Sequence, residues 1–252
     1  MTTDRLPASS SVIGRLLQEL SWSGKSIRTY RDGGLGNENV LTAEALQGLD
    51  FLPRAWFLGA VIAAAHGASA ARARLVDQVD EAAFTLLPGD MCLQASAGAD
   101  APPVCVQPDG LIVSPGCYCV LDAKRLRRGS FQTEQLAREF LLAREQAAGR
   151  APLLLLILAT EPPVPVQRSG RMYIEDAISA QLGSVLRRCG RPEGEAERLL
   201  TEVDDVVAWT TWHELAAVVE AQLAGLPDVE PPIRASITRL VASVTDAIER
   251  HG

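Results

Sequence analysis

Lysine is scarce in this chain. Only two of the 24 basic side chains among its 252 residues are lysines, Lys25 and Lys124, and the remaining 22 are arginines. The formal net charge of −7 and the sequence pI of about 5.1 exclude a histone-like protein that coats DNA by bulk positive charge, but they allow a local basic cleft. The preference for arginine is typical of a GC-rich bacterial genome, and it makes each lysine informative.

Long apolar runs are also lacking. The longest one, residues 152–159, is far shorter than the roughly 18 apolar residues of a membrane-spanning helix, so we expect no membrane partner. Residues 1–11 show no apolar core of the kind that a secretory signal contains. These observations together predict a cytoplasmic protein.

Cysteine is sparse and odd in number. The five cysteines are Cys92, Cys105, Cys117, Cys119 and Cys189, and without a secretory signal they are expected to be reduced. Cys117 and Cys119 could form half of a zinc site, but no CxxC motif or paired histidine accompanies them. Buried structural thiols are therefore favoured over a metal site.

The apolar pattern predicts an α/β protein with a mixed central sheet flanked by helices. The expected helices lie at 10–20, 38–49, 53–67, 130–148, 174–188, 193–202, 212–223 and 233–250, with Asn37 as the N-cap of the second. The expected strands lie within 75–87, 91–95, 104–114, 118–124 and 153–159. The last of these is continuously apolar, which indicates a strand that is buried on both faces.

Two parts are expected along the chain. Residues 1–165 are expected to form an α/β core with N-terminal helices, and residues 166–252 a mostly helical extension packed on it. A short strand near 205–209 is expected to add to the sheet edge, and Trp209 and Trp212 are interpreted as core or seam residues rather than ligand-binding ones.

Charged residues stand out at the end of one expected strand. Asp122 and Lys124 are two positions apart, so strand alternation places both side chains on one face while Leu121 and Ala123 face the other way. Asp109 lies at a break in the preceding strand of an expected hairpin. Two carboxylates and a lysine are therefore expected to meet at one end of a sheet, where paired oxygen ligands suit Mg²⁺.

Pro108, Asp109, Asp122 and Lys124 resemble the motif of the PD-(D/E)xK nuclease superfamily, which has the restriction-endonuclease-like fold. The expected order of helix, three strands, helix and strand over about residues 36–160 also resembles the core of that family. Lys124 is the only lysine that has an acidic residue two positions before it, because Ser23 precedes Lys25 at that spacing.

The resemblance implies Mg²⁺-dependent phosphodiester hydrolysis, with Mn²⁺ as a possible substitute. It implies that Asp109, Asp122 and the backbone carbonyl of Ala123 hold the metal, and that Lys124 orients the attacking water. Glu38, at the start of the first core helix, would complete the metal site. Gln135, with Gln132 as the next best match, would orient Lys124 or contact the substrate.

Arginines follow this motif, and they suggest a track for the DNA backbone. The candidates are Arg125, Arg127, Arg128 and Arg138. The alternative is a solvated basic face that Glu134, Glu139 and Glu145 balance through pairing along the helix.

The sequence is compatible with three functions. The leading one is a bacterial DNA nuclease of restriction, phage defence or repair, acting as a homodimer or with a partner subunit of such a complex. The second is a catalytically inactive nuclease-like domain that binds nucleic acid or serves as a scaffold. The third is a structural protein in which Asp122 and Lys124 form a solvated pair on a surface hairpin.

Overall fold

The computed structural model describes residues 37–94, 103–124 and 130–251. The expected helix at 10–20 and the glycine-rich segment at 21–36 lie outside these ranges. Among the helices within them, none is long and apolar enough to cross a membrane.

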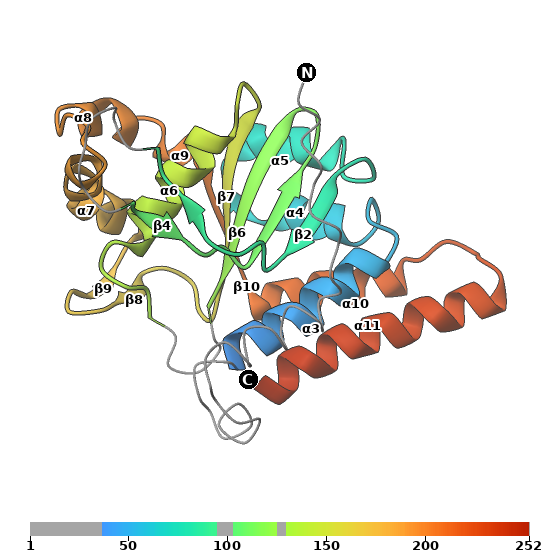
Figure 1. Ribbon diagram of the computed structural model, residues 1–252. Coiled ribbons are helices and arrows are strands. Elements are labelled where there is room, and N and C mark those ends of the chain that lie inside the picture. The colour runs from blue at the N-terminus through green and yellow to red at the C-terminus, as the bar shows by residue number, and fades with distance from the viewer. Residues whose placement is uncertain (1–36, 95–102, 125–129, 252) are drawn as a thin grey trace.

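A six-stranded mixed sheet forms the centre of the fold, in the order β1-β10-β7-β6-β5-β2 (Figure 1). Antiparallel pairing joins β2, β5 and β6, whereas β6, β7 and β10 run parallel, and β1 is antiparallel to β10. The strands span Ala83–Leu86 (β2), Gly110–Val113 (β5), Cys117–Ala123 (β6), Ala151–Leu158 (β7), Val207–Thr211 (β10) and His66–Gly67 (β1). This arrangement confirms the expected α/β class with a mixed sheet.

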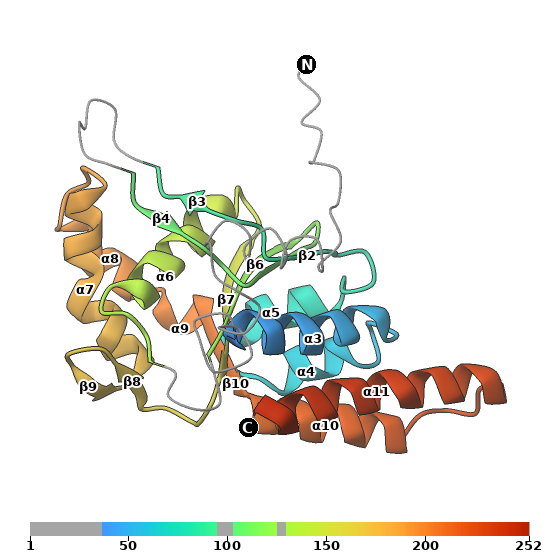
Figure 2. The same ribbon diagram turned by 60° about the horizontal axis from the view of Figure 1, so that its bottom comes forward.

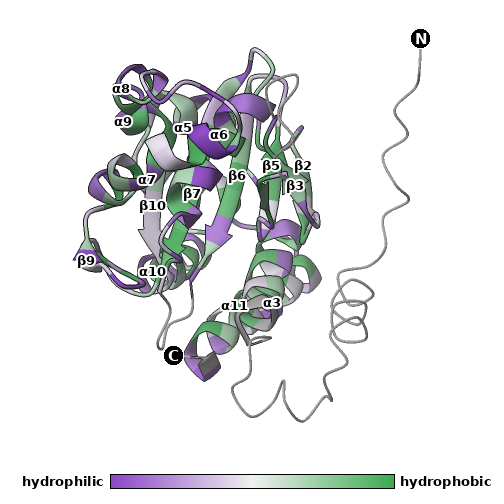
Figure 3. Ribbon diagram, turned by 60° about the vertical axis from the view of Figure 1, so that its left-hand side comes forward, coloured by the Kyte–Doolittle hydropathy of each residue, from purple (hydrophilic) through white to green (hydrophobic). Residues whose placement is uncertain are grey.

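Helices cover both faces of the sheet (Figure 2). One face shares a hydrophobic core with α3 (Asn37–Phe51), α4 (Leu58–Ala64), α5 (Ser69–Val76) and α10 (Trp212–Ala224), and α11 (Pro231–His251) packs on the outside of α3 and α10. The other face packs against α6 (Gln135–Gln146) and α9 (Val203–Val206), while α7 (Ile174–Arg188) packs on α6 and α8 (Glu195–Leu200) packs on α7. Alternate residues of β6 and β7 point into the two cores, and most of both strands is accordingly hydrophobic, whereas the end of β6 is hydrophilic (Figure 3).

The C-terminal part of the chain contributes to the sheet itself. The strand expected near 205–209 is β10, which pairs with β7 and has β1 on its other side, so it is not the edge strand. The helices expected at 174–188, 212–223 and 233–250 are α7, α10 and α11, and Trp212 is fully buried in the core. The mostly helical character expected for this part is therefore confirmed.

Some sequence predictions of secondary structure were wrong. Residues 69–76 form helix α5 where its last two residues were expected to begin a strand, because a short apolar segment fits either period. His66 and Gly67 form β1 rather than a helix end. The proline-rich segment expected as a loop contains β8 (Val164–Val166), which pairs with β9 (Gly170–Met172) in a separate hairpin. Such a two-stranded ribbon has only edge strands, where proline is tolerated.

The helix expected from Ser130 begins instead at Gln135. The segment before it pairs with the β8–β9 hairpin instead. Phe131 forms a bridge with Val166, and its N–H donates to the carbonyl of Pro165 at 2.9 Å. Phe131 is fully buried, so tertiary packing overrides the helical periodicity of this segment.

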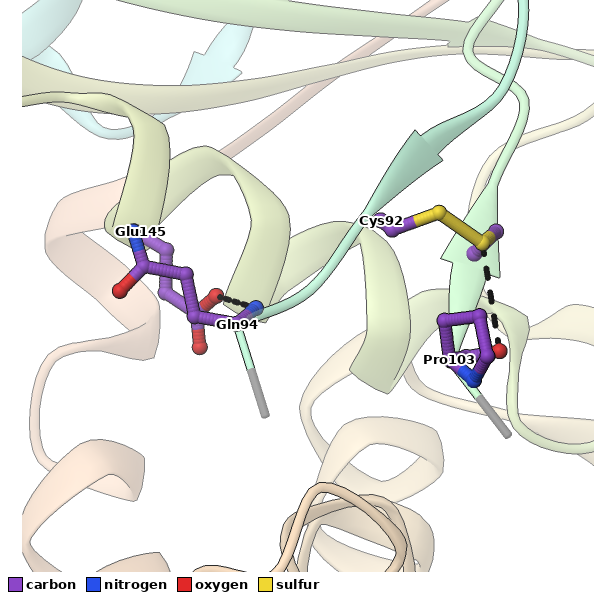
Figure 4. Close-up of a disulfide and its surroundings, with 5 residues drawn as sticks. Cys92, Gln94, Pro103 and Glu145 are labelled. Atoms are coloured by element: carbon purple, nitrogen blue, oxygen red, sulfur yellow. Dashed lines mark hydrogen bonds between the residues drawn. A yellow bond between two sulfur atoms is a disulfide. The ribbon is translucent and has the colours of Figure 1, made fainter. Parts of the chain in front are cut away.

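The expectation that all five cysteines are reduced was also wrong. Cys92 in β3 (Met91–Cys92) forms a disulfide with Cys105 in β4 (Cys105–Val106), and the two residues face each other across this two-stranded sheet (Figure 4). The other three cysteines are free and buried, as expected. Burial raises the pKa of the Cys117 thiol to about 12, so this thiol stays protonated and unreactive at neutral pH.

Candidate active site

Asp122 and Lys124 lie together at the end of β6 and are almost fully buried. Asp122 is 3% exposed and Lys124 is 9% exposed, and the Lys124 ammonium is 2.8 Å from the Oδ2 atom of Asp122. The ammonium also lies 4.9 Å from the centre of the Phe131 ring, within cation–π range. The alternative of a solvated surface pair is therefore wrong.

Asp109 reaches the same place from the neighbouring strand. Gly110 is in register with Leu121, so continuing this antiparallel pairing by one residue places Asp109 opposite Asp122. The Oδ2 atom of Asp109 accepts a hydrogen bond of 2.7 Å from the backbone N–H of Ala123, and Asp109 is only 8% exposed. The structure thus brings Asp109, Asp122, Ala123 and Lys124 together.

Gln135 joins this cluster from the first turn of α6. Its side-chain amide donates to Oδ1 of Asp122 at 3.1 Å and to Oε1 of Glu139 at 2.7 Å. Gln135 therefore contacts the carboxylate that pairs with Lys124, and it donates to Oδ1 whereas the ammonium pairs with Oδ2.

Glu139 is a member of the cluster that the sequence interpretation missed. The alternative interpretation placed it on a solvated face of the helix, but it is 0% exposed, and its Oε2 atom makes no hydrogen bond within the described part of the chain. Burial and the nearby Asp122 carboxylate raise its pKa well above the ordinary value, although Lys124 and the Gln135 amide oppose the shift. The signal that could have found it is its position four residues after Gln135, on the same helix face.

The raised pKa of Glu139 predicts a pH-dependent effect on stability. Because the folded state binds this proton more tightly than the unfolded chain, the stabilisation is complete below the ordinary pKa of 4.5 and is lost as the pH rises towards the folded-state pKa. We therefore expect the stability of the wild type relative to Glu139→Gln to decline above pH 4.5, by up to about 1.4 kcal/mol per pH unit.

Urea unfolding of both proteins in EDTA at several pH values between 5 and 8 measures this difference. Glu81→Gln, at an exposed position, controls for the change in net charge. A difference between wild type and Glu139→Gln that stays constant with pH, or that grows in favour of the wild type, would contradict the prediction.

The backbone of Lys124 is held from two further elements. Its N–H donates to the carbonyl of Ile157 in β7 at 2.8 Å, and its carbonyl accepts a 2.7 Å bond from the indole N–H of Trp212. Trp212 begins α10, where Thr211 and Glu214 form a capping box, so the position of the indole is fixed by a well-defined helix start. The C-terminal part of the chain thereby positions a residue of the cluster.

The remaining predicted residues are less closely described. Glu38 lies in the first turn of α3, and its side chain is outside the described part. Arg125, Arg127 and Arg128 fall outside the described residues. Arg138 is half-buried on α6 and contacts the side chain of Gln132 at 3.4 Å.

The acidic residues of α6 do not balance its arginines along the helix, as the alternative reading had it. Glu134 pairs with Arg188 at the end of α7, and Glu145 pairs with Arg191 in the turn after α7. Arg144 in turn pairs with Glu202. These ion pairs tie α6 to its neighbouring helices.

The donor set of the cluster has the chemistry of a site for a hard divalent cation. The carboxylate side chains of the cluster offer oxygen ligands, and the buried Oδ2 of Asp122 makes an ion pair with Lys124 and no further hydrogen bond among the described residues. Within residues 37–94, 103–124 and 130–251, no group of three or more His, Cys, Asp or Glu side chains is spaced as a complete metal cage. A metal here would thus rely on the two aspartates, backbone oxygen and water, which is how Mg²⁺ is commonly held.

No protein-family model, curated protein or solved structure matches this chain. The assignment of a function therefore depends on the geometry of the cluster and on its position in the fold.

Proposed function

We propose that this protein is a metal-dependent nuclease of the PD-(D/E)xK type that hydrolyses phosphodiester bonds in DNA. The observation that carries the proposal is the buried cluster of Asp109, Asp122 and Lys124 at the end of β6. Charged residues are seldom buried at the end of a core strand unless they are paired or functional, and here two acids accompany a single lysine.

The chain order around the cluster supports the proposal. A helix (α3) precedes three antiparallel strands (β2, β5 and β6), and a crossover through α6 leads to β7, which is parallel to β6. This is the order expected of a restriction-endonuclease-like core, and the cluster lies at the ends of its second and third strands.

Asp109, Asp122 and the carbonyl of Ala123 are the groups that would hold the cation, with Glu38 as a further ligand. The chemistry supplied by a bound Mg²⁺, or Mn²⁺ in its place, is polarisation of the scissile phosphate and a lower pKa for a coordinated water. Ala123 is fixed for this purpose because its N–H is bonded to the Asp109 carboxylate.

Lys124 contributes a compact, positively charged donor group. Held by Asp122 and the Phe131 ring, its ammonium is oriented before substrate arrives, and it can stabilise charge that develops on a phosphoryl oxygen. A guanidinium would present a wide planar fork instead, which accounts for a lysine here in a chain that has only one other lysine and 22 arginines. Gln135 keeps Asp122 oriented by donating to its other oxygen.

Cleavage of supercoiled and linear DNA tests the proposal. We expect the full chain to nick or cut plasmid DNA with Mg²⁺ or Mn²⁺, and to lose this activity in EDTA and in the variant Asp122→Asn. Variant Glu81→Gln, at an exposed position, serves as the preparation control. Equal activity in wild type and Asp122→Asn would refute the site.

A catalytically inactive nuclease-like domain is the second candidate, and the burial of the cluster favours it. Asp122 is only 3% exposed and is already paired with Lys124, so neither group is open to a substrate in this conformation. Such a domain would bind DNA or a partner in a restriction, phage-defence or repair complex. DNA binding without cleavage in any metal would support this candidate.

A further inference from the structure

The β8–β9 hairpin is fastened to the segment that holds Lys124. The N–H of Phe131 donates to the carbonyl of Pro165, and the N–H of Gln167 donates to the carbonyl of Phe131 at 2.8 Å. The Thr133 hydroxyl adds a 3.1 Å bond to the carbonyl of Gln167. Because the Phe131 ring lies against the Lys124 ammonium, the hairpin is one residue away from the candidate site.

The tip of this hairpin is exposed and carries two arginines. Residues 167–171 are all exposed, and they include Arg168 and Arg171. Within the described part of the chain the Arg168 side chain makes no ion pair or hydrogen bond, and the Arg171 guanidinium makes only a 3.5 Å contact with the Thr160 hydroxyl. Both guanidinium groups are therefore available to a partner.

The arginines of the neighbouring helices behave differently. Five arginines in or next to these helices form ion pairs with carboxylates. The arginines are Arg144, Arg187, Arg188, Arg191 and Arg198, and their partners are Glu134, Glu145, Glu193, Glu195 and Glu202. The hairpin arginines thus differ from most arginines on this face of the sheet. Glu161, Glu175 and Asp176 flank the hairpin in sequence, so attraction of an anion must come from individual guanidinium contacts rather than from a broad positive field.

We propose that the β8–β9 hairpin is a DNA-backbone clamp, in which Arg168 and Arg171 bind phosphates next to the cluster of Asp109, Asp122 and Lys124. The inference rests on the proposed function for its choice of partner. Guanidinium groups bind phosphate through paired N–H donors, and such contacts position a duplex without reading its sequence. The hairpin sits at the correct place for this task because its backbone is bonded to Phe131 on the border of the site.

The test compares two double variants of the full chain that carry the same change in charge. Arg168→Gln/Arg171→Gln alters the hairpin, and Arg74→Gln/Arg239→Gln alters exposed arginines on α5 and α11. Binding of a fluorescent duplex is measured by polarisation in EDTA, so that no cleavage occurs, over a range of salt concentrations. Thermal melts check that both variants are folded.

We expect the hairpin variant to bind the duplex about 10-fold more weakly at low salt. The slope of log K against log salt should fall by roughly 1.8, because each lost phosphate contact removes about 0.9. The control variant should retain the affinity and slope of the wild type.

An unchanged slope in the hairpin variant overturns the inference, as does an equal loss in the control variant or a wild type that does not bind DNA. Weaker binding by the hairpin variant, combined with a wild type that cleaves no DNA in any metal, supports the clamp and refutes the nuclease. Unimpaired binding by the hairpin variant alongside metal-dependent cleavage by the wild type refutes the clamp and supports the nuclease.

Discussion

Replacing Lys124 by methionine is expected to lower the rate of plasmid cleavage by about 10²- to 10³-fold, the usual effect of removing one preorganised donor to a developing oxyanion. Methionine keeps the unbranched shape that packs on Phe131, so the loss reports the missing ammonium. The measurement is the single-turnover cleavage rate at saturating Mg²⁺. Lys124→Arg is expected to recover little of the rate, because the planar fork cannot take the place of a compact ammonium.

Stability must be separated from chemistry in this experiment. Lys124→Met leaves the buried carboxylate of Asp122 without its counter-ion, and breaking a buried pair typically costs about 3–5 kcal/mol. The double variant Asp122→Asn/Lys124→Met removes both charges and is expected to regain much of this stability while remaining inactive. Wild-type activity in a folded Lys124→Met protein, or in the double variant, would remove Lys124 from the site.

The grouping of Asp109, Asp122 and Lys124 was predictable because it depends on short-range rules. Strand alternation alone places Asp122 and Lys124 on one face, and the hairpin connection between β5 and β6 brings Asp109 beside them. The buried strand β7 was equally predictable, since a continuous apolar run between two turns has few other solutions.

Glu139 could not be predicted in the same way. Its spacing from Gln135 shows only that the two share a helix face, whereas its burial depends on how α6 is placed and rotated against β6, and the predicted start at Ser130 was five residues too early. The segment before α6 is drawn into contact with the β8–β9 hairpin, which lies more than 30 residues later in the chain. Such long-range competition for backbone hydrogen bonds leaves no local pattern.

The disulfide was missed for a related reason. Cysteine number and the absence of a secretory signal describe an environment, whereas pairing depends on the register of β3 against β4, which sets Cys92 opposite Cys105. The proposed compartment therefore remains a prediction, and the disulfide removes one of the arguments for it.

Trp212→Ala is expected to be the most destabilising single substitution that affects the site from a distance. Trp212 is the largest of the fully buried side chains among the described residues, and removing such a side chain typically costs about 3–5 kcal/mol. The carbonyl of Lys124 also loses its indole donor, which adds about 1–3 kcal/mol if no other group replaces it. At about 2–4 °C per kcal/mol for a chain of this size, the melting temperature should fall by roughly 10 °C or more.

Trp212→Phe separates the two contributions. Phenylalanine preserves most of the apolar contact but cannot donate to the Lys124 carbonyl, so we expect a smaller loss of about 1–3 kcal/mol. Because the carbonyl belongs to a cluster residue, this variant should also cleave DNA more slowly at temperatures where it remains fully folded. Calorimetry and single-turnover cleavage measure the two effects. If Trp212→Phe melts and cleaves as the wild type does, the C-terminal part of the chain stabilises the fold without positioning Lys124.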